Sequence, residues 1–323
     1  MRKIVLSILP LVLLTLASMS SIVRASGKQW TELNWAQDVS IGDYDNDGLN
    51  DIAFTEGAAN RVVVYKSDGT TVIKQWTGLN YPYGVAIGDY DNDGLNEIAI
   101  TEIHDNKTTV YESDGTTVKK QWTQLEEPTG VAIGDYDNDG LNDIAIVEQG
   151  GRRVTVYKNF GTTVIKQWTE LGYPLAVAIG DYDNDGLNDI AFTEPTWDRV
   201  SVYKSDGTTL IKMWSGLNQP EGVAIGDYDN DGLNDIVFTE IYPDGSVTVY
   251  KSDGTTIIDQ WNALQTPTGV DIGDYDNDGL NEVAFTEVTK VTVIPEFTPS
   301  ILLPLFIVIT LLAVIVYKRK HSV

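Results

Sequence analysis

Short runs of alternating apolar and polar residues fill the middle of the chain, without the spacing of apolar residues that indicates helices. In the run EIAITE, Ile98 and Ile100 fall on one face of a strand and the residues between them on the other. Three similar runs occupy 62–66, 72–76 and 85–88, and the glycine-containing turn SDGT joins the first two. The pattern predicts four short strands per structural unit.

The same pattern returns at a fixed interval. The phrase GDYDNDGLNDIAFTE begins at Gly42 and recurs, with minor changes and a spacing of 46 or 47 residues, at Gly88, Gly134, Gly180, Gly226 and Gly273. A fixed period of this length indicates one supersecondary unit per repeat, and four strands in such a unit are typical of a propeller blade. We therefore predict an all-β fold, a six-bladed β-propeller, with an open β-solenoid as the alternative.

The incomplete repeats at the two ends predict how the ring closes. The sixth unit stops at Ile294 and lacks its last turn and fourth strand, whereas 27–30 (GKQW) reads as a fourth strand with no unit before it. We expect this first strand to complete the last blade. Six equivalent tryptophans then match six blades: Trp30, Trp76, Trp122, Trp168, Trp214 and Trp261.

The two ends of the chain predict export and anchoring. Residues 1–25 have a basic start, an apolar run and a small-residue end, as a secretory signal does, although an uncleaved N-terminal anchor is the alternative. Residues 301–317 form an apolar run long enough to span a thin bilayer, and the basic tail 318–323 predicts that this end stays inside. The propeller, 26–294, would then lie outside the cell.

The segment 295–300 links the propeller to the apolar run and contains the tripeptide PEF. This tripeptide, followed by an apolar run and a basic end, resembles the C-terminal sorting signals of archaeal surface proteins. That resemblance implies removal of the tail by an archaeosortase-type transpeptidase and re-anchoring through a lipid. With or without this processing, we expect a cell-surface protein.

Each repeated phrase has the composition of a loop that binds a hard cation. Carboxylates stand at relative positions 1, 3, 5 and 9, glycine at position 6 allows a tight turn, and the carbonyl at position 7 adds an oxygen. Ca²⁺ takes six to eight oxygen ligands of these kinds. The predicted ligands are Asp43, Asp45, Asp47, Leu49, Asp51; Asp89, Asp91, Asp93, Leu95, Glu97; Asp135, Asp137, Asp139, Leu141, Asp143; Asp181, Asp183, Asp185, Leu187, Asp189; Asp227, Asp229, Asp231, Leu233, Asp235; and Asp274, Asp276, Asp278, Leu280, Glu282.

These loops are not EF-hands, because position 12 holds an apolar strand residue such as Phe54 or Ile100 where an EF-hand has a bidentate Glu. The strand–loop–strand setting resembles the D-x-D-x-D-G-x-x-D loops of FG-GAP/VCBS-type propeller repeats, as in integrin α-chain heads. The resemblance covers 28–294 and implies about six structural Ca²⁺ ions. The FG and GAP elements themselves are not recognisable, and the repeat is shorter than that of integrins.

Charge and composition support a metal-stabilised, extracellular domain. Segment 26–297 contains all 47 acidic residues and 16 of the 22 basic ones, a net charge of −31. This charge excludes nucleic-acid binding, which needs an excess of Lys and Arg. The chain has no Cys, so metal ions rather than disulfides would stabilise it. Asx-rich turns that need no metal are the alternative.

The connections into each first strand and the turns between second and third strands vary among the units, whereas the acidic loops do not. Variable aromatic residues on a rigid scaffold favour a recognition surface, and drift of unconstrained loops is the alternative. We expect adhesion to, or recognition of, an extracellular protein or glycan. The candidate partner-binding residues are Trp35, Tyr81, Tyr83, Tyr173, Trp197 and Tyr242.

The sequence does not favour catalysis. Outside the two ends it holds a single histidine, His104, and no Ser/His/Asp constellation or cysteine nucleophile. Every unit ends its second strand with a glutamate: Glu56, Glu102, Glu148, Glu194, Glu240 and Glu287. In five of the six units we expect a basic residue across the hairpin to pair with it; a cluster of carboxylates near a central channel that binds a cation or acts as an acid is the alternative. We predict that the protein is not an enzyme. A passive envelope component, or less favourably a propeller lyase or hydrolase, is the alternative.

Overall fold

The computed structural model describes residues 27–159, 161 and 163–295, which belong to one compact unit, Ala25–Pro295. The predicted signal segment (1–25), the apolar run (301–317), the basic tail and all but the first residue of the linker lie outside the described residues. Within the described part, no helix has the length and apolar character needed to cross a membrane. A single 3-10 turn, η1 (Pro195–Trp197), accompanies 24 strands there.

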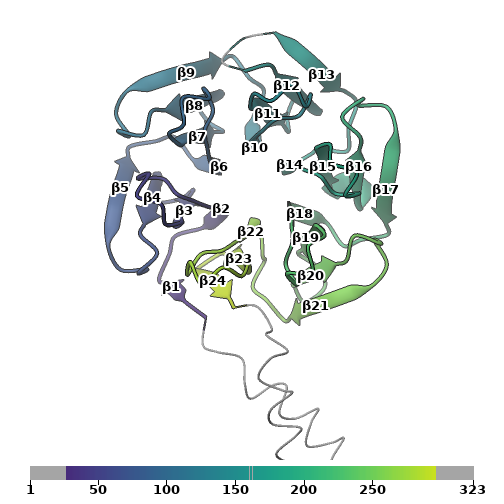
Figure 1. Ribbon diagram of the computed structural model, residues 1–323. Helices are drawn as coiled ribbons and strands as arrows, with labels where there is room; N and C mark the ends of the chain where they lie inside the picture. Colours follow the sequence, from purple (N-terminus) through teal and green to yellow (C-terminus); the bar gives the residue numbers. More distant parts are fainter. Residues whose placement is uncertain (1–26, 160, 162, 296–323) are drawn as a thin grey trace, which may run out of the picture. The chain divides into compact units, whose positions relative to one another are not determined.

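The strands form six antiparallel sheets of four, arranged around a common centre as propeller blades (Figure 1). This confirms the predicted fold. Blade 1 contains β2 (Ala36–Gly42), β3 (Asp51–Glu56), β4 (Arg61–Tyr65) and β5 (Val72–Thr77); blade 2 contains β6 (Pro82–Gly88), β7 (Glu97–Glu102), β8 (Lys107–Tyr111) and β9 (Val118–Thr123); blade 3 contains β10 (Pro128–Gly134), β11 (Asp143–Glu148), β12 (Arg153–Tyr157) and β13 (Val164–Trp168). Blade 4 contains β14 (Val177–Gly180), β15 (Asp189–Glu194), β16 (Arg199–Tyr203) and β17 (Leu210–Ser215); blade 5 contains β18 (Pro220–Gly226), β19 (Asp235–Glu240), β20 (Ser246–Tyr250) and β21 (Ile257–Asn262); blade 6 contains β22 (Val270–Gly273), β23 (Glu282–Glu287), β24 (Lys290–Ile294) and β1 (Gln29–Thr31).

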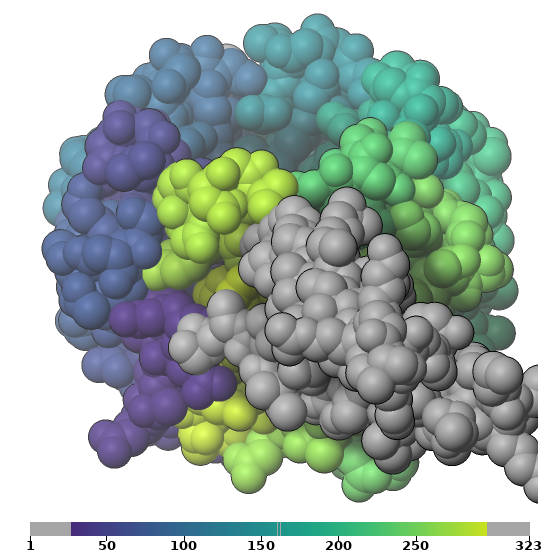
Figure 2. Space-filling view, turned by 60° about the horizontal axis from the view of Figure 1, so that its bottom comes forward, coloured from purple at the N-terminus to yellow at the C-terminus, as the bar shows by residue number. Residues whose placement is uncertain are grey.

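The first strand completes the last blade, as the incomplete repeats predicted. Strand β1 pairs with β24 in antiparallel register, with Gln29 opposite Thr292 and Trp30 opposite Val291. In Figure 2 the purple N-terminal residues accordingly lie against the yellow residues of blade 6. The ring is therefore closed by hydrogen bonds and packing rather than by a continuous chain.

The hydrophobic core lies between neighbouring blades. The second strand of each blade is buried on both faces because the blades on either side cover it. One cluster, for example, joins Val110 and Trp122 of blade 2 to Ile144 and Ile146 of blade 3. Each blade thus depends on its neighbours for burial of its apolar side chains, as expected for a repeat architecture.

The tryptophan at the end of each outer strand connects an acidic loop to the next blade. Trp76 packs edge-on against Tyr44, which occupies position 2 of the loop in its own blade, with ring centroids 6.0 Å apart. It also contacts Tyr111 of blade 2 at 5.6 Å. Tyr44 is 2% exposed, so the loop is fixed to the core directly beneath it.

Candidate metal centres

Six acidic loops join the first and second strands of the blades, and backbone amides shape each of them. In loop 1 (43–51), the Asp43 carboxylate accepts hydrogen bonds from the amides of Asp47 (3.0 Å) and Gly48 (2.9 Å). The Asp51 carboxylate accepts from the amides of Tyr44 (3.0 Å) and Asp45 (3.2 Å). Gly48 has a φ of 90°, in the region that favours glycine, which is why position 6 needs this residue.

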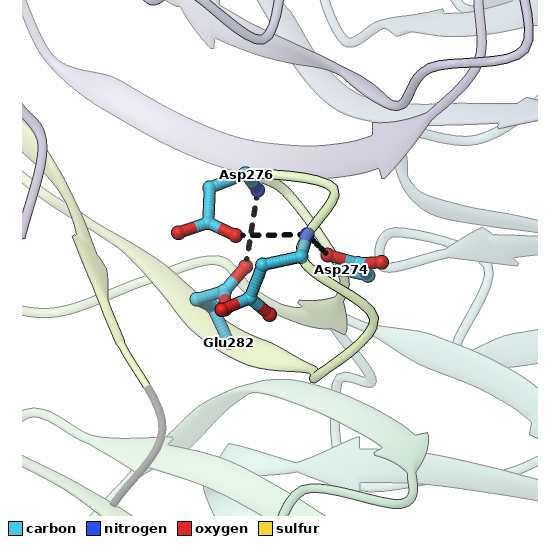
Figure 3. A group of neighbouring side chains, drawn as sticks. Asp274, Asp276 and Glu282 are labelled. Carbon is cyan, nitrogen blue, oxygen red and sulfur yellow. Dashed lines mark hydrogen bonds between the residues drawn. The ribbon is translucent and has the colours of Figure 1, made fainter. Parts of the chain in front are cut away.

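These hydrogen bonds bring carboxylates from positions 1, 3 and 9 together. One oxygen from each lies within 4.8 Å of the others in loop 1, formed by Asp43, Asp45 and Asp51. In loop 6 the group also includes the position 5 residue, Asp278. Figure 3 shows the side chains of Asp274, Asp276 and Glu282 directed toward a common space. The corresponding groups in loops 2, 3 and 4 are Asp89, Asp91, Glu97; Asp135, Asp137, Asp143; and Asp181, Asp183, Asp189.

The donor set fits a hard divalent cation. One carboxylate oxygen at position 3 is inaccessible to solvent and accepts no hydrogen bond in four loops, those of Asp45, Asp137, Asp183 and Asp229. In loop 2 the buried carboxylate oxygen that accepts no hydrogen bond belongs to Glu97, at position 9. Burying a carboxylate oxygen without a donor is costly, and a cation ligated by oxygen removes that cost. The chemistry and spacing of these residues therefore suit Ca²⁺.

Burial also perturbs the position 9 carboxyls. Desolvation raises the pKa of Asp51 to about 6 and that of Glu97 to about 7, and the pKa of Asp235 likewise rises to about 7. A divalent ion beside these groups would favour the ionised form. The backbone carbonyls of the position 7 leucines remain predicted ligands; the leucine side chains themselves are exposed, as at Leu49 and Leu95.

The carboxylate at position 5 of the loop has different contacts from those at positions 1, 3 and 9. In loop 1, Asp47 accepts a hydrogen bond from the amide of Leu49 through Oδ1, and its Oδ2 lies 2.8 Å from Nζ of Lys66. The same ammonium lies 2.6 Å from Oδ2 of Asp45. Sequence reasoning missed this lysine, although the repeated VYK at the end of the third strand was a visible signal. Equivalent contacts are made by Lys158, Lys204 and Lys251.

The asparagines at positions 4 and 8 link the six loops into a closed ring. Asn96 of loop 2 donates its backbone amide to Oδ1 of Asn46 in loop 1 (2.8 Å) and its side-chain amide to the carbonyl of Asp43 (2.7 Å). The pair recurs at every junction, including the one between Asn50 and loop 6. We name this ring of loop-to-loop hydrogen bonds the asparagine ring. The asparagines at positions 4 and 8 are visibly repeated in the sequence, but nothing in the sequence alone indicates their role.

The predicted partner residues lie at the opposite end of the blades. Trp35, Tyr81 and Tyr173 are in connections from one blade to the next, and Tyr83 is near the start of β6. Trp197 and Tyr242 are in turns between the second and third strands of a blade. Four of them are largely exposed: Trp35 (53%), Tyr173 (45%), Trp197 (43%) and Tyr242 (57%). The guanidinium of Arg152 lies over both Tyr173 and Trp197, at 5.3 and 6.0 Å from the ring centroids.

The other two predicted partner residues occupy different positions. Tyr81 packs against His104 with a centroid distance of 5.0 Å, so this histidine belongs to an aromatic contact. The hydroxyl of Tyr83 instead points to Glu221 of blade 5, at 3.4 Å, across the mouth of the central channel. Tyr83 therefore lines the channel mouth rather than the outer surface.

Residues with left-handed backbone conformation recur at one position of these connections. All six have φ between 50° and 58° although none is glycine, and half of them are aromatic. Such conformations cost free energy in non-glycine residues and concentrate where a loop is constrained for function. The residues are Trp35, Tyr81, Glu127, Tyr173, Gln219 and Thr266.

The glutamates that end the second strands form the predicted ion pairs. Glu194 lies 2.5 Å from Nε of Arg199, and Glu102 lies 3.0 Å from Nζ of Lys107. Each glutamate also accepts a backbone amide from the connection above it, as Glu102 does from Asn80 (2.8 Å). Five of these acids are buried and Glu240 is partly exposed, and none of the six lines the cavity of the central channel. Their visible role is to hold the connections in place.

The central channel contains a cavity of about 200 Å³ lined by the innermost strands of all six blades. Most residues that line it have apolar side chains, but Asp38 and Asp271 introduce two carboxyls. Their oxygens accept amides across the blade boundaries, Asp38 from Val85 (3.0 Å) and Asp271 from Ile41 (2.7 Å). Burial raises the pKa of both carboxyls to about 7.

Comparisons with known proteins agree with the geometry. The model of the FG-GAP-like repeat matches five overlapping stretches: 43–100, 89–146, 135–192, 181–238 and 227–285. No curated protein matches the chain. Among solved structures, a chain in the crystal structure of BBS1N in complex with ARL6DN, soaked with mercury, is 11% identical with a TM-score of 0.58, over 85% of this chain and 97% of that one.

The crystal structure of the same complex soaked with lead gives 12% identity and a TM-score of 0.60, over 85% of this chain and 98% of the other. At these identities the likeness shows the fold alone. The repeat match, in contrast, spans most of the propeller and begins each time at position 1 of an acidic loop. The chain belongs to the FG-GAP-like repeat family.

Proposed function

We propose that this protein is a calcium-binding propeller that acts at the cell surface as a recognition or adhesion module for an extracellular protein or glycan. The observation that carries the calcium assignment is the convergence of carboxylate oxygens in the acidic loops, with a buried oxygen that lacks a hydrogen-bond donor. The loops lie at one end of the blades and are joined to each other through the asparagine ring, so the ions would have a structural role.

The recognition surface is the opposite end of the propeller. Trp35, Trp197 and Tyr242 present large exposed rings there. The ion-paired Glu56 accepts the amide of Asn34, next to Trp35, and the ion-paired Glu194 directly precedes the turn that contains Trp197. Exposed aromatic side chains on a rigid scaffold supply contact area at little cost in conformational entropy. The proposed surface location rests on the sequence of the two ends of the chain, which predicts a signal segment and a membrane anchor.

A binding experiment tests the recognition function. The full chain, immobilised in calcium, is exposed to a panel of glycans and to candidate envelope proteins, in parallel with Trp197→Ala and Trp35→Ala variants. We expect a ligand that the wild type retains and the variants lose, with unchanged thermal unfolding. Val118→Ala is the matched control, because Val118 is an exposed apolar residue on an outer strand away from the connections.

The outcomes separate the candidate functions. Retention that survives both aromatic substitutions would refute the assignment of this surface. If the folded protein retains nothing from the panel, the recognition function fails and a structural role in the envelope becomes the better account.

A further inference from the structure

In the described part of the chain, lysines contact five of the six acidic loops, and in four of these loops the lysine comes from the same place in the repeat. The lysine that follows the third strand extends to the loop of its own blade and contacts the carboxylates at positions 3 and 5. For Lys204 the distances from Nζ are 2.7 Å to Asp183 and 2.6 Å to Asp185. For Lys251 they are 2.5 Å to Asp229 and 2.8 Å to Asp231. The four lysines are about one third exposed.

The repeat does not require a lysine at this place. The equivalent position is Glu112 in the second unit and Pro295 in the sixth, although the loops themselves keep the same pattern. In the second unit, Lys119 of strand β9 pairs with Asp91 of the loop and with Glu112. The lysine is therefore an addition to particular loops rather than a consequence of the fold.

We propose that Lys66, Lys158, Lys204 and Lys251 are tethered competitors of Ca²⁺ that set the affinity of loops 1, 3, 4 and 5. This inference rests on the proposed calcium function. Nζ of Lys66 contacts Oδ2 of Asp45, a member of the converged group whose other oxygen, Oδ1, is buried and accepts no hydrogen bond. An ion bound at Oδ1 would lie within a few ångströms of the ammonium and repel it.

The ammonium also occupies a carboxylate oxygen at position 5 of the loop. In loop 1, the two oxygens of Asp47 are engaged by Lys66 and by the amide of Leu49, and this aspartate is absent from the converged group. Calcium must therefore displace the lysine to recruit position 5. Without calcium the same ammonium neutralises part of the loop's charge, so the metal-free loop is less strained by repulsion.

The expected size of the effect follows from the exposure of the ion pairs. Ion pairs as exposed as these contribute little net free energy, so the change in the dissociation constant should be about fivefold. Removing the lysines should therefore tighten calcium binding at these loops by about fivefold. It should also lower the thermal unfolding temperature in chelator, where the ammonium is the only counter-charge that the described part of the chain supplies to loop 1.

The experiment compares two quadruple variants of the full chain by calorimetric titration with CaCl₂. The test variant carries Lys66→Met, Lys158→Met, Lys204→Met and Lys251→Met. The control carries Lys74→Met, Lys120→Met, Lys166→Met and Lys212→Met; these lysines lie over tryptophan rings at 5.5–5.7 Å, so the same charge is removed without touching a loop carboxylate. The control accounts for the general effect of a more negative protein.

We expect the test variant to bind calcium about fivefold more tightly than the control, and to gain more in unfolding temperature on moving from chelator to calcium. Equal affinities in the two variants, with calcium bound by both, would overturn the role of the lysines and leave the calcium function intact. Failure of the wild type to bind calcium would overturn both proposals. If the quadruple test variant does not fold, Lys66→Met against Lys74→Met provides the same comparison for loop 1.

Discussion

At the scale of single residues, a threonine in the second strand joins neighbouring blades. The hydroxyl of Thr101 donates to the carbonyl of Thr129 in the next blade (2.7 Å) and accepts from the amide of Gly84 in its own (2.7 Å). Equivalent threonines do this in four other blades. In blade 3 the position holds Val147, which cannot form either bond.

This difference predicts a stabilising substitution. Gly130 lies against both a methyl group of Val147 and the carbonyl of Leu175, the counterparts of the groups around Thr101. Val147→Thr should therefore gain two hydrogen bonds and raise the free energy of unfolding by about 1 kcal/mol. Denaturant unfolding measures the change, and Thr101→Val should lower stability by a similar amount. A destabilised Val147→Thr protein would contradict the account.

The channel carboxyl of Asp271 predicts a pH effect. Its pKa rises from 3.8 to about 7 because the folded state buries it. The folded state therefore holds a proton between pH 4 and 7 that the unfolded state has lost, and the stability associated with this proton disappears as the pH rises through 7.

Asp271→Asn removes this titration. The free energy of unfolding of the variant, minus that of the wild type, should be at least about 1 kcal/mol larger at pH 8 than at pH 5. This change with pH does not depend on the constant cost of the substitution itself. Unfolding of both proteins at the two pH values, with the same calcium concentration, measures the difference. A stability difference that does not depend on pH would show that Asp271 is ionised throughout.

At the scale of structural elements, the loops are positioned from both sides. The tyrosine at position 2 packs on the outer-strand tryptophan, and the asparagine ring fixes each loop to the next. Left-handed φ values near 60° at Asn46 and Asn92 suit asparagine, which tolerates this region better than most residues. Asparagine at these positions thus serves geometry rather than ligation.

The asparagine ring predicts that a residue that is not a metal ligand contributes to loop stability. Asn96→Ala removes the side-chain bond to Asp43 and should lower the free energy of unfolding by about 1–2 kcal/mol. The neighbouring, exposed Leu95 offers a control, because Leu95→Ala should change stability by less than about 0.5 kcal/mol. Equal effects of the two substitutions in denaturant unfolding would argue against the ring.

The sequence predicts an element well when the element repeats along the chain, and it predicts a contact well when the two residues are close in sequence. The period of 46 residues predicted the blades, and the orphan strand at 27–30 predicted the closure with β24. The Glu–Arg pairs, five residues apart across a hairpin, were also predictable.

Contacts that cross a blade boundary were not predictable. Tyr83 is 138 residues from Glu221, and only the closed ring brings their side chains together. Asn96 reaches a loop 50 residues earlier for the same reason. The lysines could have been noticed, but the sequence gives no indication that the side chain turns back to its own loop.

At the scale of the whole molecule, charge and ring closure are connected. The chain carries 47 acidic and 22 basic residues, and the acidic loops collect carboxylates at one end of a ring that no peptide bond closes. Metal ions there would relieve repulsion in the loops, and the asparagine ring would transmit that stabilisation from blade to blade. The opposite end, with its exposed aromatic residues, would then remain a fixed surface.

The most direct test of this account is thermal unfolding of the full chain in excess calcium and in chelator, with magnesium as the comparison ion. An ion that binds only the folded state at 100 times its dissociation constant contributes about 2.7 kcal/mol per site. Several sites together should raise the unfolding temperature by at least about 10 °C. Magnesium should have a smaller effect, because it prefers a stricter octahedral geometry. Coincident unfolding curves in calcium and in chelator would contradict the proposal that the propeller binds calcium.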